Sequence, residues 1–278
     1  MKLTVLVDNH TLIDRYFKGE PGVSYYIEVA DKRILFDLGY SDLFLENGRK
    51  LGVQFEALDA VVISHSHLDH TWGMEPLVKH FNERLMEGLH YKRPTLIAHP
   101  EIFRPRSFNG RDEFGMNISS DTVFKYLEDG LSKSPVWITD KLVFLGEIPR
   151  ENDFEALSAI GDIVVSGKQV PDFSIDDSAL CYMANDGLVI ITGCSHSGIC
   201  NIIEYAKKVC HENRILDIIG GFHLLDPEAK QLEETVHYLS KQSVAFLHAC
   251  HCTDLRSKIA LSTVVALKEV GVGLKLVY

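Results

Sequence analysis

The chain has 278 residues, of which 46% are hydrophobic and 24% are charged. This is ordinary globular composition, and it excludes a disordered tail, a collagen-like repeat and a coiled coil. The 28 basic and 39 acidic residues give a formal net charge of −11, which disfavours nonspecific binding to nucleic acid or to an anionic membrane. No apolar run reaches about 18 residues, so the sequence predicts no membrane span. Histidine, with 13 copies, is the unusual component.

The amino-terminal segment and the cysteines both bear on the compartment. Met1–Asp8 reads MKLTVLVD, a short apolar alternation that lacks the charged region, long apolar run and cleavage site of a signal peptide. The six cysteines all lie at or after position 181 and include no C-x-x-C pair. A secreted disulfide framework would have a shorter chain with denser cysteines. We therefore expect a cytoplasmic protein with reduced thiols.

Short β-rich runs separated by turns dominate the first third of the chain. Strands are predicted over Lys2–Val7, Ser24–Val29, Arg33–Phe36 and Ala60–Ser64. Amphipathic spacing predicts helices over Ser41–Gly52 and Met74–Leu89. The last of these strands is apolar up to its final residue, which is typical of a strand covered on both faces.

The middle of the chain has a less regular pattern. A buried strand is predicted over Pro94–His99 and a short helix over Asp121–Leu131. Residues 100–120 show no clear period, and structureless stretches of this length in compact domains are usually functional or mobile. We expect a loop or lid over a site near 100–120.

The second half repeats the alternation of strands and helices. Strands are predicted over Val136–Leu145, Ile163–Ser166, Ser178–Met183, Gly187–Thr192, Leu216–Ile219, Val244–His248 and Leu274–Tyr278. Helices are predicted over Ile199–His211, Pro227–Lys241 and Ser257–Val270. Interleaving in both halves favours an α/β fold with two mixed β-sheets flanked by helices, an αββα sandwich. The candidate site residues come from both halves, so we expect a single domain over residues 1–278.

Residues 64–70 read Ser-His-Ser-His-Leu-Asp-His, directly after a predicted buried strand. Side chains at i and i+2 of an extended segment point the same way, so His65 and His67 can bind one metal ion together. A following turn would bring Asp69 and His70 toward a second ion. Imidazole and carboxylate mixtures suit Zn²⁺, Mn²⁺ or Fe. A solvated His-rich loop is the alternative, but the H-x-H-x-D-H spacing after a buried strand favours a metal site.

This segment resembles the signature of the metallo-β-lactamase superfamily, whose fold is the αββα sandwich. Asp37-Leu38-Gly39 is similar to the D-x-G turn of that family, and Thr71-Trp72-Gly73 stands in place of its T-G-G, with an indole in the middle. Within the superfamily the chain resembles the 7,8-dihydropterin-6-yl-methyl-4-(β-D-ribofuranosyl)aminobenzene 5′-phosphate synthase-like group. The segments that carry this likeness are LVDN (6–9), GEPGVSYYIE (19–28), LGEIPREN (145–152), TGCSHSGICNIIEYAKK (192–208), IIGGFHL (218–224) and HACHCT (248–253).

The resemblance implies further metal ligands at strand ends. His196 is expected to be a ligand by analogy with the group, and His251 matches the last histidine of the superfamily, with His248 as the alternative. In most family members a bridging aspartate ends the strand equivalent to Gly187–Thr192, and this chain has no aspartate there. Either Cys194 or His196 serves in its place, or the bridge is lost. The expected cofactor is one or two divalent ions, with zinc first and manganese or iron as alternatives.

The chemistry follows from the metals. A bound Zn²⁺ lowers the pKa of its water from 15.7 toward about 7, and Asp69 is expected to orient the resulting hydroxide. His223, at another strand end, is expected to touch substrate or act as a general acid, with a loop histidine bonded to the backbone as the alternative. Arg150, Arg104 and Arg106 are candidates for binding a substrate phosphate, because guanidinium groups match phosphate bidentately. Exposed solubilising charge is the alternative for each arginine.

Two functions are compatible with this site. The first is a metal-dependent hydrolase that acts on a phosphate-containing small molecule. The second is the transferase that the group name implies, which condenses a pterin diphosphate with an aromatic amine. A diiron redox role is disfavoured because the segment lacks the glutamate of such relatives, and a β-lactamase role because no secretion signal is found. A metal-binding module without enzyme activity is the remaining alternative.

Overall fold

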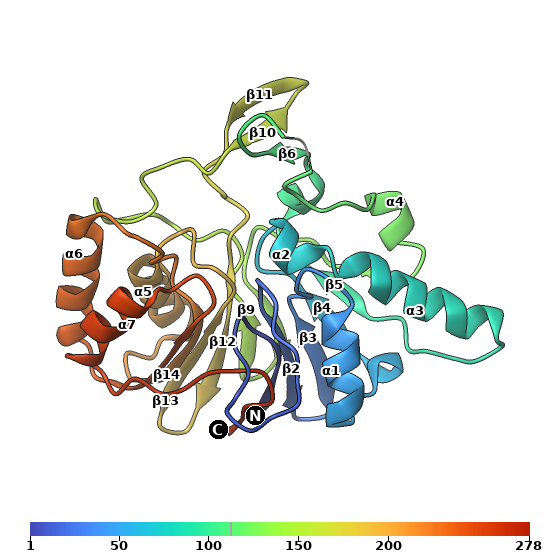
Figure 1. Cartoon of the computed structure of the whole chain (residues 1–278), viewed down its shortest axis with the longest axis horizontal. Coiled ribbons are helices and arrows are strands. Elements are labelled where there is room, and N and C mark those ends of the chain that lie inside the picture. Colours follow the sequence, from blue (N-terminus) through green and yellow to red (C-terminus); the bar gives the residue numbers. More distant parts are fainter. Residues whose placement is uncertain (112) are drawn as a thin grey trace.

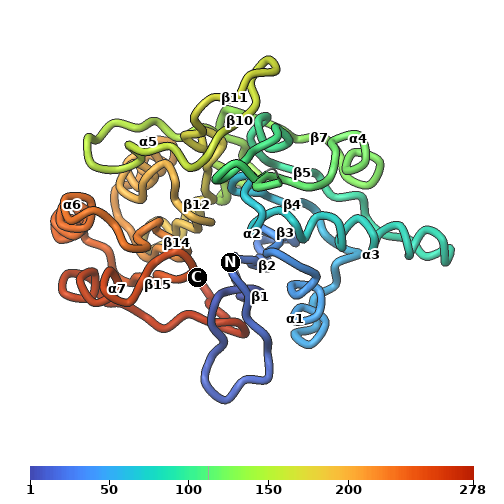
Figure 2. The backbone as a smooth tube through the Cα atoms, turned by 45° about the horizontal axis from the view of Figure 1, so that its top comes forward, coloured from blue at the N-terminus to red at the C-terminus, as the bar shows by residue number. Residues whose placement is uncertain are grey.

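The structure of the chain, a computed structural model, describes residues 1–111 and 113–278. Two large β-sheets lie face to face (Figure 1). Helices α1 (Leu43–Leu51) and α3 (Met74–Met86) lie on the side of the first sheet, whereas α5 (Ile199–Cys210), α6 (Ala229–Ser240) and α7 (Leu255–Ser262) lie on the side of the second (Figures 1 and 2). This four-layer arrangement confirms the predicted αββα sandwich.

The first sheet joins the amino-terminal strands to the last strand of the chain. In spatial order its strands are β16 (Lys275–Val277), β1 (Lys2–Val7), β2 (Ser24–Val29), β3 (Lys32–Phe36), β4 (Ala60–Val62), β5 (Thr95–Ile97) and β7 (Glu128–Asp129). Pairing is antiparallel from β16 to β3 and parallel from β3 to β7. The parallel strands therefore end at one edge, where β4 delivers the H-x-H-x-D-H segment.

The second sheet is also mixed. In spatial order its strands are β15 (Val244–Cys250), β14 (Ile215–Gly221), β13 (Gly187–Thr192), β12 (Ala179–Ala184), β9 (Leu142–Phe144) and β8 (Val136–Thr139). Strands β13, β14 and β15 are parallel, so the loops that follow them leave the sheet at the same edge.

Apolar side chains from both sheets fill the space between them. Phe36 and Val62 of the first sheet and Phe144 and Ile191 of the second are fully buried in this shared core. All six residues of β13 are buried, which explains its unbroken apolar sequence. No helix in the described part of the chain is long and apolar enough to cross a membrane.

A third, small sheet accompanies the segment predicted as a loop or lid. It consists of β11 (Lys168–Pro171), β10 (Asp162–Val165) and β6 (Arg106–Ser107), and it lies beyond α2 (Leu68–Thr71) at the top of Figure 1. Residues 100–120 are therefore partly ordered by pairing with β10. Asp112, within the same segment, lies outside the described residues, and the role of the segment as a lid stays a prediction.

Three predicted elements differ from the structure. Residues 136–145 form the hairpin β8–β9, because the Thr139 hydroxyl accepts hydrogen bonds from the backbone of Lys141 (3.2 Å) and Leu142 (3.1 Å) and closes a turn. The helix predicted over 257–270 is α7, which ends at Ser262. Beyond it the backbone pairs with Leu247 of β15 through Ala266 and Lys268.

The helix predicted over 121–131 is also shorter than expected. Only α4 (Ser120–Val123) is helical, and the chain continues into β7, which pairs with β5. In both cases the residues after the helix pair with a backbone partner elsewhere in the sequence. The spacing of apolar residues alone does not predict such a partner.

Candidate metal centre

Histidines from both sheets meet where β4, β13 and β15 end. His65 and His67 follow β4, His196 follows β13, and His251 follows β15. The ring nitrogens of His67 and His196, from opposite sheets, lie 3.0 Å apart. The edge of the sandwich at which these strands end is therefore one site built from both halves of the chain.

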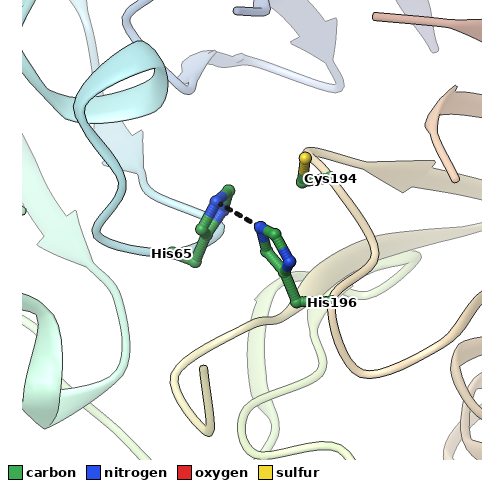
Figure 3. A group of neighbouring side chains, drawn as sticks. All are labelled: His65, Cys194 and His196. Carbon is green, nitrogen blue, oxygen red and sulfur yellow. Dashed lines mark hydrogen bonds between the residues drawn. The ribbon is translucent and has the colours of Figure 1, made fainter. Parts of the chain in front are cut away.

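Three of these nitrogens form a nearly equilateral triangle. His65 Nε2 lies 3.1 Å from His67 Nδ1 and 3.1 Å from His196 Nε2. Figure 3 shows His65 and His196 facing each other, with Cys194 nearby. Imidazoles that share a Zn²⁺ ion through bonds of about 2.0–2.1 Å hold their nitrogens about 3.1–3.4 Å apart. His65, His67 and His196, here called the first trio, fit one divalent ion.

The other three predicted ligands form a second triangle, here called the second trio. His70 Nε2 lies 3.3 Å from His251 Nε2. Asp69 Oδ2 lies 3.7 Å from the His70 nitrogen and 3.3 Å from the His251 nitrogen. The two imidazole side chains are 0% and 6% exposed, and the carboxylate is 23% exposed. This donor set also suits zinc, manganese or iron.

A buried carboxylate orients one imidazole of each trio. Asp37 Oδ2 lies 2.7 Å from His70 Nδ1 and accepts a 2.7 Å hydrogen bond from the Ser64 hydroxyl. That hydroxyl lies 2.9 Å from His65 Nδ1. Because both Nδ1 atoms face oxygens, the Nε2 atoms point into the trios, as metal-ligating histidines require. The pattern Asp37-Leu38-Gly39 thus marks a supporting residue of the site.

The two trios differ in protonation. Burial lowers the pKa of each imidazole in the first trio, that of His67 to about 3. Burial acts in the same direction on His70, but the carboxylates of Asp69 and Asp37 outweigh it and raise the His70 pKa to about 9. The first trio is therefore neutral and ready to bind a cation at neutral pH, whereas His70 carries a proton until an ion displaces it.

Cys194 lies between the trios. Its Sγ is within 4.8 Å of the donor nitrogens of His65 and His196 on one side and of His70 and His251 on the other. Of the two residues considered for the role of the bridging aspartate, Cys194 lies between the trios and His196 belongs to the first trio. The sulfur is 3.0 Å from the Sγ of Cys252, a neighbour that the sequence pattern did not single out, because the two cysteines are 58 residues apart.

His223 stands beside the first trio. Its ring centre lies 4.4 Å from that of His196, and its Nδ1 is buried without a hydrogen-bond partner among the described residues. Burial lowers its pKa, but interaction with Cys252 outweighs burial and raises it. His223 is thus placed to exchange a proton with a group bound next to the trios.

A pocket of about 360 Å³ opens against His196 and His223. Its walls include Phe154, Leu157 and Phe173. It also has polar lining residues, namely Ser158, Ser174, Glu228, Lys230 and Gln231. An apolar pocket with a few polar groups beside a cluster of donors is the usual form of a small-molecule site.

Arg106 supports the site through buried carboxylates that contact the ligand loop. The residue is 3% exposed. Its guanidinium forms ion pairs with Asp172 at 2.7 Å and with Asp176 at 2.9 Å. Asp176 in turn accepts a 2.9 Å hydrogen bond from the backbone N–H of Ser66, between His65 and His67. The structure thus commits Arg106 to internal carboxylates that hold the ligand loop, and sequence reasoning missed this link because it joins three distant segments.

The other two arginines also bond within the protein. Arg104 forms an ion pair with Glu101. Arg150 donates to the carbonyl oxygens of Phe173 and, at 3.0 Å, Ser174, both of which line the pocket. None of the three predicted phosphate-binding arginines is among the described residues that line the pocket beside the trios. Arg150 acts on it indirectly, by fixing part of its wall.

The fold and the site together define an enzyme of the metallo-β-lactamase type. The sequence model of the Metallo-beta-lactamase superfamily matches residues 18–209, and the chain belongs to this superfamily. The 7,8-dihydropterin-6-methyl-4-(beta-D-ribofuranosyl)-aminobenzene-5'-phosphate synthase of Methanocaldococcus jannaschii is 30% identical to it over 275 residues, which cover 93% of this chain and 89% of the relative. The resemblance noted from the sequence is thereby confirmed.

Two further comparisons cover nearly the whole length or all of it. An uncharacterised protein of Methanocaldococcus jannaschii is 31% identical over 94% of this chain and 93% of its own length. The crystal structure of Tm1679, a metal-dependent hydrolase of the β-lactamase superfamily, superposes with a TM-score of 0.83 and 27% identity over 100% of this chain and 99% of that one. These relatives include both a synthase and a hydrolase.

Proposed function

We propose that the chain is a metal-dependent hydrolase that acts on a phosphate-containing small molecule. The observation that carries this proposal is the pair of donor trios beside a pocket, with nitrogens 3.0–3.1 Å apart in the first. Bound divalent ions, zinc first and manganese or iron as alternatives, would acidify a water molecule and neutralise charge on a phosphate. Cys194, between the trios, is proposed as the shared ligand in place of the aspartate.

The protein side chains around the trios supply proton transfer and orientation. Asp69, the most exposed donor of the second trio, accepts a hydrogen bond from the attacking water and orients it. His223 holds a proton at Nδ1 and gives it to the leaving group. Lys230 at the pocket contributes a positive charge toward a phosphate, and Arg150 keeps the wall at Phe173 in place.

Transfer in place of hydrolysis is the second candidate. In that reaction an aromatic amine displaces pyrophosphate from a pterin diphosphate. The name of the Methanocaldococcus jannaschii relative supports it, as do the apolar walls Phe154, Leu157 and Phe173, which suit a flat ring. Water and the amine would attack the same kind of substrate, so the two candidates differ in the nucleophile.

Product analysis separates the candidates. Zinc-loaded protein is incubated with a phosphomonoester, a phosphodiester and a pterin diphosphate, each with and without an aromatic amine. Phosphate or alcohol release in water alone supports the hydrolase, whereas pyrophosphate release that requires the amine supports the transferase. A protein that binds zinc but turns over none of these substrates, under conditions in which a known phosphodiesterase is active, would contradict both.

We further propose that the protein acts in the cytoplasm on a small molecule without a nucleic-acid or membrane partner. All six cysteines are free, which suits a reducing compartment. The net charge of −11 disfavours polyanionic surfaces.

A further inference from the structure

Two thiols meet across a strand at the metal centre. Cys194 follows β13 and Cys252 follows β15, and β14 lies between these strands. The two Sγ atoms are nevertheless 3.0 Å apart, and Cys252 Sγ also lies 3.4 Å from the carbonyl oxygen of Cys194. The thiols therefore reach each other over the end of β14.

Gly221, the last residue of β14, makes this approach possible. A Cβ at this position would lie 2.6 Å from Cys252 Sγ and 3.1 Å from the His251 ring. Real Cβ atoms do not approach sulfur this closely, so any side chain here would push Cys252 away. The absence of a side chain at Gly221 leaves the space in which the two sulfurs lie.

The two cysteines differ in what surrounds them. Cys194 is 5% exposed and faces both trios, whereas Cys252 is partly exposed. The backbone N–H of His223 donates to Cys252 Sγ at 3.2 Å. A small oxidant can thus reach Cys252 first, with Cys194 behind it.

We propose that Cys194 and Cys252 form a reversible disulfide that withdraws the Cys194 sulfur from the metal centre. This inference rests on the proposed metal site. A low-molecular-weight disulfide exchanges with the Cys252 thiol and releases one small thiol, and the Cys194 thiolate then attacks the mixed disulfide at Cys252 and releases the second. Two protein thiols are oxidised and one small disulfide is reduced to two thiols, so atoms and electrons balance.

The two sulfurs need to move only a short distance for this bond to form. A disulfide has an S–S length of about 2.05 Å, so the sulfurs must approach by about 1 Å from their present 3.0 Å. In the disulfide, Cys194 can no longer act as a thiolate ligand. Oxidation therefore weakens ion binding between the trios, and reduction restores it.

The chain contains a matched control pair. Cys181 Sγ and Cys210 Sγ lie 3.6 Å apart in the core of the second sheet and α5. Both side chains are buried, at 0% and 4% exposure, and neither belongs to the donor groups of the metal centre. An oxidant that acted on any close thiol pair would cross-link these two as well.

The test uses the full chain and needs no substrate. Metal-free, reduced protein is incubated with oxidised glutathione, remaining thiols are alkylated under denaturing conditions, and peptides are mapped by mass spectrometry. The expected product has a Cys194–Cys252 cross-link, whereas Cys181 and Cys210 remain free thiols and are recovered in alkylated form. After zinc is added and excess removed, elemental analysis should show at least one ion fewer per chain than in the reduced protein, and dithiothreitol should restore the difference.

Two variants complete the test. In Cys252→Ser the zinc content should no longer depend on glutathione disulfide, and Cys252→Ala serves if the serine variant does not fold. Cys210→Ser should respond as the unaltered protein does. Absence of the cross-link in metal-free protein, or a cross-link that leaves zinc content unchanged, would overturn the inference. A protein that cross-links and loses zinc but turns over no phosphate substrate would instead refute only the proposed reaction.

Discussion

Asp37 Oδ2 lies 2.7 Å from His70 Nδ1, and both side chains are completely buried. The same oxygen accepts a hydrogen bond from the Ser64 hydroxyl, which lies 2.9 Å from His65 Nδ1. One carboxylate therefore orients an imidazole of each trio, although it belongs to neither.

Replacement of this carboxylate should weaken metal binding without removing a ligand. Asp37→Asn leaves His70 without its anionic acceptor, and loss of such a partner typically costs 10–100-fold in metal affinity. Competition with a chromogenic chelator measures the change. Asp31→Asn, an exposed carboxylate in the turn between β2 and β3, is the matched control and should bind zinc like the unaltered protein. Equal affinity in both variants would contradict the supporting role of Asp37.

Removal of a donor from either trio should abolish turnover while the fold persists. His67→Ala and Asp69→Ala each delete one donor at the edge of the sandwich, away from the shared core, so we expect a loss of at least about 100-fold in kcat/KM with an unchanged circular dichroism spectrum. His237→Ala, an exposed histidine on α6, is the control. Unchanged turnover in the first two variants would show that the trios do not carry the reaction.

The two trios should differ in proton release when they bind zinc. Imidazoles of the first trio are neutral at pH 7.5, because burial lowers their pKa values. His70, with a pKa of about 9, must lose a proton to bind an ion. In the variant Cys194→Ala, which removes the proton of the proposed shared thiol, titration calorimetry in two buffers of different ionisation enthalpy should therefore report release of about one proton for the second trio and close to none for the first.

The pH dependence provides the control for this experiment. Proton release from the second trio should shrink as pH rises through about 9, since His70 is then already neutral, and the affinity of that trio should level off. Release that is equal for both ions, or constant up to pH 10, would show that His70 is not protonated in the metal-free protein.

Asp177 should make the metal-free protein less stable as pH rises. Its carboxyl is buried, which raises its pKa from 3.8 to about 6, and it bonds to the backbone N–H and hydroxyl of Ser197. An acid whose pKa is higher in the folded than in the unfolded state stabilises the fold below about pH 4, and that contribution is lost as pH rises through about 6.

The variant Asp177→Asn isolates this effect. A rise of the Asp177 pKa from 3.8 to about 6 corresponds to about 2–3 kcal/mol, so the free energy of unfolding of the variant should gain roughly that amount relative to the unaltered protein between pH 4 and pH 7.5. Urea unfolding in the presence of a chelator measures it. A difference between the two proteins that does not change with pH would mean that Asp177 titrates like an exposed carboxyl.

The sequence predicted the parts of the site that lie close together along the chain. The spacing of His65, His67, Asp69 and His70 was sufficient to place four donors, because a strand and a turn determine where such neighbours point. The family resemblance added His196 and His251, which the structure brings to the same edge. Elements with their own periodicity, such as β13 and α5, were also predicted with nearly correct bounds.

What escaped prediction depends on distant partners. Arg106 has the chemistry of a phosphate ligand, but Asp172 and Asp176 surround it, and neither is near it in sequence. Cys252 is next to His251 along the chain, yet its contact with Cys194 depends on the bare backbone of Gly221. Local patterns identify which groups are present, whereas their use depends on what the fold places against them.

The distance between His70 and His251 along the chain, 181 residues, also sets the order of events during synthesis. The first trio is complete only after β13 and His196 have been synthesised, and the second only after β15 and His251. Contacts this far apart in sequence form late, after both sheets have docked. A growing polypeptide therefore holds only fragments of the centre, and ions can be captured with full affinity only after the chain through His251 has left the ribosome.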